Sequence, residues 1–315
     1  EAGSTTELRR KTIMKKKVFS VMTAAALVFS LTACSTNAKT EEPETAAQSS
    51  ASQTEAAGAE TAESSGGASA EAGEKAASGE TKAAGDTFTV GFDQDFPPMG
   101  FVGDDGEYTG FDLELAAEVA DRLGLTFVPQ PIAWDAKNME LESGNIDCIW
   151  NGFTMTGRED EYTWSEPYME NSQVVVVLED SGIESTADLA GKIVEVQADS
   201  SAEAALKEMP ELTESFAALQ TTPDYNTAFM DLEMGSVDAI AMDVIVAGYQ
   251  LQQRDGGFKI LDDTLASEEY AIGFKKGNEA LRDQVQTVLD EMASDGTMKE
   301  ISEKWFGEDI TTIGK

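Results

Sequence analysis

The chain has 315 residues and carries 59 acidic against 22 basic side chains, with no histidine and two cysteines. The acidic excess lies mostly after residue 86, where the net charge is −34, and this charge argues against a protein that binds nucleic-acid phosphates. Without histidine, Ser-His-Asp and Cys-His catalysis and the common zinc sites are excluded, and two cysteines cannot form a disulfide framework.

Residues 14–34 predict an export signal. Lys15 to Lys17 form a basic start, and residues 18–31 form a mostly apolar stretch of 14 residues, which is too short for a membrane-spanning helix of about 20 residues. The alternative is a short buried helix. Residues 1–13 precede a better start at Met14, and we interpret them as a mis-called or non-native extension outside the fold.

The segment Leu31-Thr32-Ala33-Cys34 resembles a bacterial lipobox. This resemblance implies a lipoprotein signal peptide over 14–33 and diacylglycerol on the thiol of Cys34. The alternative is plain cleavage that leaves Cys34 as an idle thiol. Residues 35–86 contain no aliphatic side chain larger than alanine, no methionine, no aromatic side chain and no cysteine. We therefore expect residues 34–86 to form a lipidated, disordered acidic tether.

Strands and helices are predicted to alternate from residue 87 onward. Periodicity predicts strands at 88–93, 125–130 and 146–152, and helices at 111–124 and 135–144. For the first helix, Thr109 with Asp112 predicts the N-terminal cap and Gly124 the C-terminal end. This alternation is typical of an α/β fold with a mostly parallel sheet.

An internal similarity predicts two related lobes. Residues 139–149 and 230–240 match at six of eleven positions, and both read as a helix end, a glycine turn and a buried strand. Chance similarity of two such units is the alternative. The strand-like segments 174–180 and 268–277 are candidates for the crossings between lobes, and 281–307 is predicted to be one returning helix. The expected boundaries are 87–176 and 272–315 for lobe 1, and 177–271 for lobe 2.

The segment Gly110–Gly124, GFDLELAAEVADRLG, closely resembles the signature of family 3 extracellular solute-binding proteins, the amino-acid receptors of ATP-driven importers. Further segments follow in the family's order over residues 87–308: 91–101, 141–149, 151–159, 164–171, 237–243 and 295–307. The resemblance implies a two-lobe, Venus-flytrap fold with two hinge strands. It also implies an amino-acid ligand, permease subunits of an ABC importer as partners, a monomer, and a place on the outer side of the cell membrane.

The resemblance implies that Arg158 binds the ligand's α-carboxylate, for which a guanidinium offers two parallel hydrogen bonds. The family has one more residue before this arginine than the present chain. The alternative is a surface arginine paired with Asp160 or Glu161. Gly152 and Thr154 would offer backbone and hydroxyl groups. Thr156 with Glu159 also fits a capping box at a helix start.

From the other lobe, the resemblance implies that Ser200 and Ser201 also contact the carboxylate. Asp199 stands where the family has glycine, and Ser200 with Glu203 fits another capping box. Asp243 matches the family's ammonium-binding aspartate, and an N-cap of the following helix is its alternative.

Aromatic side chains are expected to form the walls of the site. Phe96 and Trp134 match the family's aromatic positions, with a core role as the alternative for each. Trp150 and Cys148 are expected in the core. Three polar residues are expected to contact or select the ligand side chain: Asp93, Asn151 and Gln197.

The leading hypothesis is a lipid-anchored amino-acid receptor that is not an enzyme and uses no cofactor or metal. A second hypothesis is an enzyme on the same fold, dehydratase-like or peptidoglycan-acting, which would need a raised-pKa carboxylate such as Asp243 or Asp93. A third is a sensor that works without a transporter. The acidic segment 103–107 lacks the spacing of a calcium loop and is interpreted as a hairpin turn.

Overall fold

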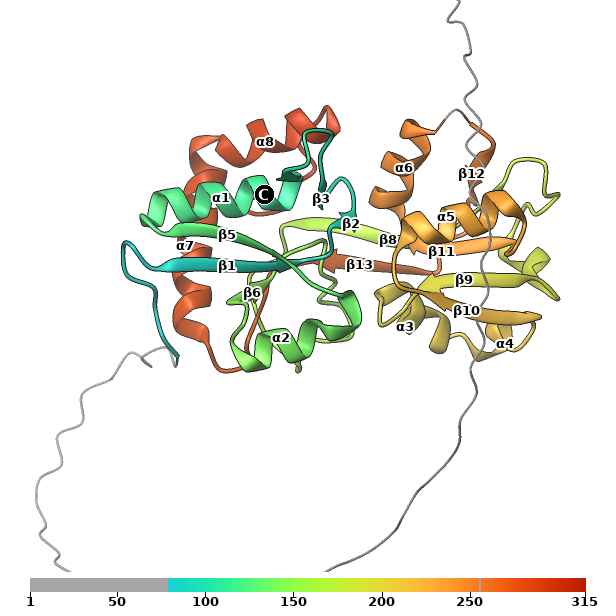
Figure 1. Cartoon of the computed structure of the whole chain (residues 1–315), viewed down its shortest axis with the longest axis horizontal. Helices are drawn as coiled ribbons and strands as arrows, with labels where there is room; N and C mark the ends of the chain where they lie inside the picture. Colours follow the sequence, from blue (N-terminus) through green and yellow to red (C-terminus); the bar gives the residue numbers. More distant parts are fainter. Residues whose placement is uncertain (1–78, 255) are drawn as a thin grey trace, which may run out of the picture. The chain divides into compact units, whose positions relative to one another are not determined.

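The computed structural model describes residues 79–254 and 256–315. The predicted signal peptide, Cys34 and most of the predicted tether lie outside these residues. The described part has two lobes, each built on its own sheet, as the sequence predicted (Figure 1). No helix in it is long and apolar enough to cross a membrane.

The first lobe is built on a five-stranded sheet in the order β5-β1-β6-β14-β7. Strands β5, β1 and β6 are parallel, and β14 is antiparallel to both of its neighbours, β6 and β7. These strands are β1 (Thr87–Phe92), β5 (Thr126–Pro131), β6 (Cys148–Ile149), β7 (Thr163–Trp164) and β14 (Gly273–Phe274). A small antiparallel sheet joins β2 (Asp95–Phe96), β3 (Gly100–Val102) and β4 (Tyr108–Thr109).

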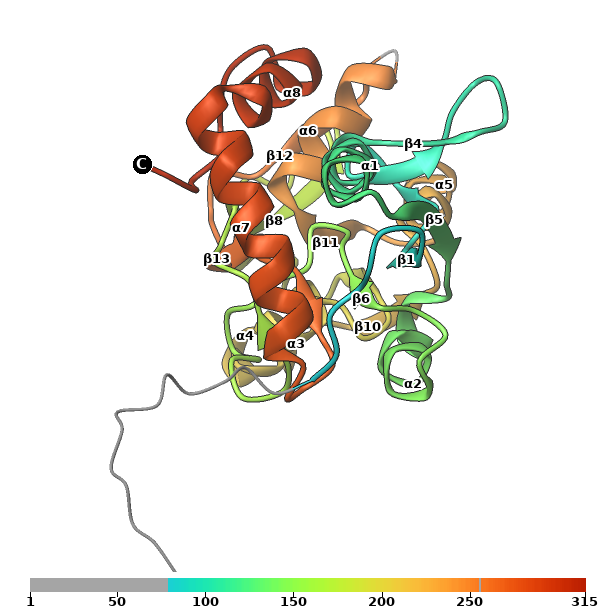
Figure 2. The same ribbon diagram turned by 90° about the vertical axis from the view of Figure 1, so that its left-hand side faces the viewer.

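Helices cover both faces of the first sheet. Helix α1 (Phe111–Leu123) packs with α7 (Glu279–Asp295) and α8 (Thr297–Phe306) in one apolar core. The short 3-10 turn η1 (Trp134–Ala136) and α2 (Lys137–Ser143) pack in a separate, aromatic-rich core. Figure 2 shows this lobe end-on, with α1 and α2 on opposite sides of β1 and β5.

The second sheet has the order β10-β9-β11-β8-β12, and β13 also pairs with β8. Strands β10, β9 and β11 are parallel, and β8 is antiparallel to all its partners. The strands are β8 (Met169–Leu178), β9 (Ile193–Gln197), β10 (Ala218–Thr222), β11 (Ala239–Asp243), β12 (Phe258–Ile260) and β13 (Ala266–Tyr270).

Two layers of helices cover the second sheet as well. Successive valines of β8 face opposite sides: Val174 and Val176 join the core under α5 (Tyr225–Met234) and α6 (Val244–Gln253). Val175 and Val177 join the core under α3 (Ser201–Lys207), α4 (Pro210–Thr213) and the 3-10 turn η2 (Thr186–Leu189). The run of four valines in β8 is therefore explained by burial on both faces.

The two lobes repeat one topological unit. In each, three strands alternate with helices and the first strand lies between the other two, giving β5-β1-β6 and β10-β9-β11. The two similar segments of sequence are the matching α2–β6 and α5–β11 pieces. Both helices end at a glycine in the left-handed conformation, Gly144 with φ 76° and Gly235 with φ 72°. Only glycine adopts this conformation without strain, which explains the shared pattern.

Strands β8 and β13 run between the lobes (Figure 1). Pairing of β8 with β11 already begins at Gln173. The first change of lobe therefore lies before the boundary at 176 that the sequence predicted, because β8 pairs with β11, β12 and β13 of the second sheet. The chain returns between β13 and β14, at residues 271–272.

Several local expectations were wrong. The predicted helix 281–307 is broken at Gly296, whose φ is 90°, and the predicted strand 146–152 is paired only over β6. Gly110, not Thr109, is the N-cap of α1 and makes no side-chain cap bond. No helix follows Thr156, whose hydroxyl instead accepts a hydrogen bond from the Glu269 amide.

Contacts with the first lobe begin before residue 87, the predicted start of that lobe. The Lys82 ammonium lies 2.7 Å from the Asp147 carboxylate, and the Lys82 amide donates to Gln284 of α7. The Gly85 amide donates to the Gly124 carbonyl. The end of the expected tether is therefore hydrogen-bonded to the first lobe.

Candidate functional site

A narrow cavity lies where the carboxyl ends of the parallel strands of both lobes meet. It is lined by nine of the ten predicted ligand-binding residues together with Gln197. The lining residues are Phe96, Trp134, Asn151, Gly152, Thr154, Arg158, Gln197, Ser200, Ser201 and Asp243. Asp93 lines an adjoining cavity, to which Trp134 also contributes. The fold thus brings together side chains up to 147 positions apart in the chain.

The loop after β6 is held in place by a hydrogen bond to a buried carboxylate. Asp112, at the start of α1, accepts hydrogen bonds from the Gly152 amide (2.6 Å) and the Tyr168 hydroxyl (2.9 Å). Burial raises the pKa of Asp112 to about 7, against the lowering effect of these two donors. Gly152 has φ 55°, and a Cβ there would lie 3.1 Å from the rings of Phe96 and Tyr270. Glycine is therefore needed for both conformation and space.

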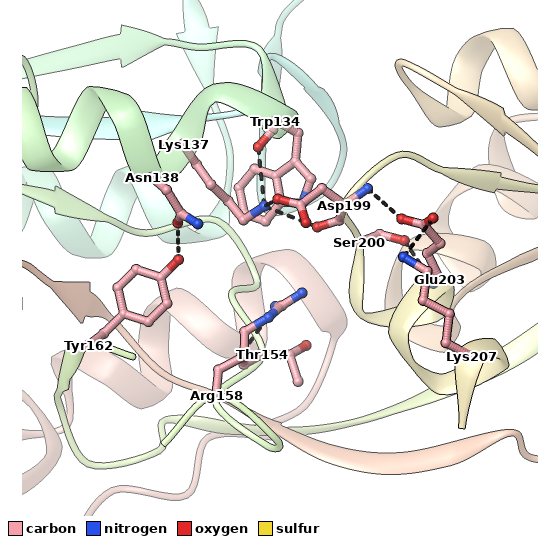
Figure 3. A network of polar contacts seen from close by, with 10 residues as sticks. All are labelled: Trp134, Lys137, Asn138, Thr154, Arg158, Tyr162, Asp199, Ser200, Glu203 and Lys207. Atoms are coloured by element: carbon pink, nitrogen blue, oxygen red, sulfur yellow. Dashed lines mark hydrogen bonds and ion pairs between the residues drawn. The ribbon is translucent and has the colours of Figure 1, made fainter. Parts of the chain in front are cut away.

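Arg158 lies in the loop that continues from β6, and its side chain extends into the space between Thr154 and Ser200 (Figure 3). Its Nη1 donates to the Thr154 carbonyl at 3.4 Å, and its guanidinium carbon lies 5.4 Å from the Phe153 ring centroid. Within the described residues it forms no ion pair with Asp160 or Glu161, so its charge stays available to an anion. The surface-pairing alternative is therefore wrong.

Both predicted wall residues, Phe96 and Trp134, line the cavity. Phe96 is buried and its ring lies 6.0 Å from that of Tyr225 across the two lobes. Trp134 is half-buried, packs edge-on against Phe153 and has the Lys137 ammonium 4.9 Å from its ring centroid. Trp150 and Cys148 are fully buried in the main core, as expected.

Ser200 and Ser201 stand at the start of α3 in the second lobe. Ser200 is the N-cap, and its hydroxyl accepts from the Glu203 amide at 3.1 Å. The predicted capping box is only half formed, because the Glu203 carboxylate accepts from the Asp199 amide instead. The Ser201 hydroxyl lies 3.2 Å from the Thr154 hydroxyl of the first lobe and 3.0 Å from Gln173 Nε2.

Asp243 ends β11 and is buried. It occupies the N-cap position of α6 but makes no cap bond there. Its Oδ1 instead accepts from Asn171 (2.7 Å), Gln173 (2.8 Å) and the Tyr270 hydroxyl (2.7 Å). Burial raises the pKa of Asp243, and the nearby Glu268 carboxylate raises it further.

Asp93 follows β1 and is tied to the opposite lobe. Its Oδ2 accepts from Gln197 Nε2 at 2.6 Å, and its amide donates to Asn151 Oδ1 at 3.0 Å. Burial raises the pKa of Asp93 to about 6. Asn151 and Gln197 thus both orient Asp93.

An ion pair closes the cleft from its outer side. The buried Lys137 of α2 pairs with the carboxylate of Asp199 and donates to the Asp199 carbonyl at 3.0 Å (Figure 3). Asp199 has φ 57°, the conformation for which the family's glycine is suited. The substitution of this glycine therefore adds a contact between lobes.

Sequence reasoning missed four polar residues of the site: Lys137, Asn171, Gln173 and Glu268. Glu268 is buried and its Oε1 lies 2.9 Å from the Thr154 hydroxyl. Alternation along the segment 268–277 places Glu268 and Tyr270 on one side, and this was the available signal. Among the described residues, no group of three or more acidic or cysteine side chains is arranged to hold a metal ion.

Comparison with known proteins agrees with this architecture. Residues 88–308 match the family model of bacterial extracellular solute-binding proteins, family 3. The L-cystine-binding protein TcyJ of Escherichia coli (strain K12) is 33% identical over 228 residues, which cover 71% of this chain and 84% of that protein.

Two solved structures are also similar. An ABC uptake transporter substrate-binding protein from Streptococcus pneumoniae with bound histidine is 38% identical with a TM-score of 0.69, covering 72% of this chain and 94% of that one. The ancestral amino acid-binding protein AncCDT-1, a precursor of cyclohexadienyl dehydratase, is 32% identical with a TM-score of 0.63, covering 70% and 95%. The chain therefore belongs to family 3 of the bacterial extracellular solute-binding proteins.

Proposed function

We propose that this protein is a lipid-anchored receptor on the outer side of the cell membrane that binds a free, polar amino acid and delivers it to an ABC importer. One observation carries the proposal. Arg158 of the first lobe and Asp243 of the second line a single cavity between strand ends, with aromatic side chains beside them. A cation and an anion so placed match the two charged ends of an amino acid.

The proposed binding mode assigns one function to each group. Arg158 grips the α-carboxylate with two parallel hydrogen bonds, and the hydroxyls of Thr154 and Ser201 add one each. Asp243 accepts from the ammonium. Phe96 and Trp134 pack against the ligand side chain, and Asp93 in the adjoining cavity favours neutral or basic side chains over acidic ones.

Closure of the lobes would couple binding to delivery. A ligand that contacts both lobes only in the closed form shifts the hinge equilibrium towards that form. The importer's permease subunits would then recognise the closed form of a monomeric receptor. The relatives support the ligand class, since one is named for L-cystine binding and a solved structure holds histidine.

The lipid anchor rests on the sequence around Cys34. Mass spectrometry of the N-terminal peptide should find diacylglycerol on Cys34 as the first residue. The Cys34→Ala variant should be released from the membrane fraction. An unmodified Cys34 thiol in a membrane-free protein would contradict the anchor and leave the ligand assignment intact.

The ligand is identified by thermal unfolding of the purified protein with each of the twenty amino acids, cystine and ornithine. A ligand at 100 times its Kd adds about 2.7 kcal/mol, or roughly 5–10 °C for a domain of this size. We expect a shift with one chemical group of L-amino acids.

The carboxylate assignment is tested with Arg158→Ala. Loss of a guanidinium from a closed charge-assisted pair costs about 3–5 kcal/mol, so affinity should fall at least about 100-fold. Arg158→Lys should weaken binding less, because lysine keeps the positive charge but cannot make the two parallel hydrogen bonds of a guanidinium. Lys299→Ala removes an exposed charge on α8 and should bind as the natural chain does. Unchanged affinity of Arg158→Ala would contradict the assignment.

A second candidate function is an enzyme on the same fold. The observation in its favour is the buried carboxylate of Asp243, whose raised pKa suits acid–base chemistry, inside the cavity. Similarity to a precursor of a dehydratase points the same way. Product formation from cyclic dienyl acids would support it, whereas tight stoichiometric binding without turnover supports the receptor.

A further inference from the structure

Two buried carboxylates share the same hydrogen-bond donors beside the cavity. Gln173 Nε2 lies 2.8 Å from Asp243 Oδ1 and 2.6 Å from Glu268 Oε1. Asn171 Nδ2 likewise lies 2.7 Å and 2.6 Å from the same two oxygens. All four residues are 7% exposed or less. The hinge strands β8 and β13 thus hold Glu268 directly against the residue proposed to bind the ligand's ammonium.

This cluster contains more acceptors than donors. Within the described part of the chain, no lysine or arginine forms an ion pair with Asp243 or Glu268. The amide oxygens Asn171 Oδ1 and Gln173 Oε1 are buried there without a hydrogen-bond partner. Two buried, ionised carboxylates that share the same donors repel strongly, so such a pair binds either a proton or another cation.

We propose that Glu268 is the second carboxylate of the ammonium subsite at Asp243, that the pair holds one proton in the empty cleft, and that the arriving ammonium displaces this proton to solvent. This inference rests on the proposed function and adds a residue and a proton to its binding step. The proton leaves from a carboxyl O–H and passes to water or buffer. The ligand's ammonium keeps its own charge and then faces two carboxylates.

The two buried tyrosines beside the pair keep their charge state near neutral pH. Burial raises the pKa values of Tyr270 in β13 and Tyr225 in α5 well above their usual range, so both stay neutral. The Arg158 guanidinium lines a cavity together with Glu268. Glu170 and Glu269 face each other on the exposed side of the hinge strands. Asp93 and Asp112 also titrate in this range and need controls.

The proposal fixes the sign of the pH dependence. A ligand that binds only the deprotonated pair gains affinity as pH rises and reaches a plateau above the pair's titration. Below it, affinity falls by at most tenfold per pH unit. We expect binding at least about tenfold weaker at pH 5.5 than at pH 7.5, for ligands that do not titrate between these values.

The experiment is calorimetry of the whole protein at pH 6.5 with L-glutamine, L-arginine and L-cystine, repeated in buffers of low and high ionisation enthalpy. We expect nearly one proton released per ligand bound by the natural chain. Glu268→Gln should release close to none and lose the pH dependence, since removal of the like charge lets Asp243 ionise. Asp93→Asn and Asp112→Asn should keep the release. Binding without proton release, release retained in Glu268→Gln, or release lost in Asp93→Asn or Asp112→Asn would each overturn the proposal.

A ligand-free measurement separates this inference from the proposed function. Carboxyl-carbon NMR of the empty protein should show the pair titrating near neutral pH, and Asp243→Asn or Glu268→Gln should remove that titration. A pair fully ionised at pH 6 would overturn the inference even if amino acids bind. If no amino acid shifts the melting temperature, the proposed function fails, and the NMR titration still decides whether the pair holds a proton.

Discussion

Asp112 accepts hydrogen bonds from distant residues that its local sequence does not reveal. Its position near Thr109 predicted a helix cap. Its carboxylate instead accepts a hydrogen bond from the amide of Gly152, which lies 40 positions later in the sequence. One oxygen accepts both hydrogen bonds, and the other is buried without a partner. This environment favours the protonated acid, which explains the pKa of about 7.

The Asp112→Asn variant should therefore be more stable than the natural chain at alkaline pH. A carboxyl whose pKa is raised by folding weakens stability as pH climbs from about 4 to 7, and the full cost is present above 7. Asparagine resembles the protonated acid and escapes this cost. We expect a gain of about 2–4 kcal/mol at pH 8 and almost none at pH 4.5, measured by urea unfolding at both values. An equal or lower stability at pH 8 would show that the ionised form is well solvated.

At the scale of elements, glycines decide where helices end. The periodicity of 281–307 continues through residue 296 and so predicted a single helix. The break arises because Gly296 adopts φ 90°, which turns α8 away from α7. Gly248 lies inside α6 with open space around its Cα and no unusual φ. The two glycines thus differ in backbone conformation, which is left-handed at Gly296 and helical at Gly248.

Alanine at these two positions should have opposite effects. Gly296→Ala forces a side chain into the left-handed region and should destabilise the protein by about 1–2 kcal/mol. Gly248→Ala keeps a helical conformation and should stabilise it by about 0.5–1 kcal/mol. Urea unfolding at pH 7 measures both. If both variants were destabilised equally, the break at Gly296 would not depend on its backbone conformation.

For the molecule as a whole, closure depends on a few contacts between lobes. Lys137 pairs with Asp199, Gln197 donates to Asp93, and Asn226 donates to Asp95 at 3.1 Å. Burial lowers the pKa of Lys137, and the Asp199 carboxylate partly offsets this. These contacts would be lost in an open form, so they favour closure before any ligand enters.

Loss of the Lys137–Asp199 pair should weaken ligand binding, although neither residue is proposed to contact the ligand. Asp199→Gly removes the carboxylate and also relieves the positive φ, so the fold itself should not be destabilised. Because the Asp199 side chain is half exposed, we expect about 1 kcal/mol, or roughly fivefold weaker binding. Titration calorimetry measures the affinity, and small-angle scattering should show a larger radius of gyration for the empty variant.

The partner variant and a matched control complete this test. Lys137→Met should weaken binding to a similar extent, and the double variant should be little worse than either single one. Asp238→Ala breaks the Lys192 pair within the second lobe and should leave affinity unchanged. Additive losses in the double variant would show that the two residues do not act through each other.

The sequence by itself determined the fold class, the two related lobes and most of the cavity. The periodicity of hydrophobic residues, glycine turns and strand ends are local features. Strands, helices and the loops after them could therefore be predicted from the sequence. Arg158 and Asp243 stand in segments beyond strand ends, where parallel sheets present side chains together, whereas Ser201 was assigned by resemblance to the family.

The tertiary structure alone decided which carboxylates lie next to each other and which are held apart. Asp112 meets Gly152 because the first lobe packs α1 against the loop after β6, and Glu268 meets Asp243 because their strands both pair with β8. Lys137 meets Asp199 because the two lobes lie against each other. Their protonation depends on burial and on neighbouring charge, which are properties of the packed molecule. No local pattern encodes them, so the proton proposed for the ammonium subsite could be inferred only from the assembled hinge.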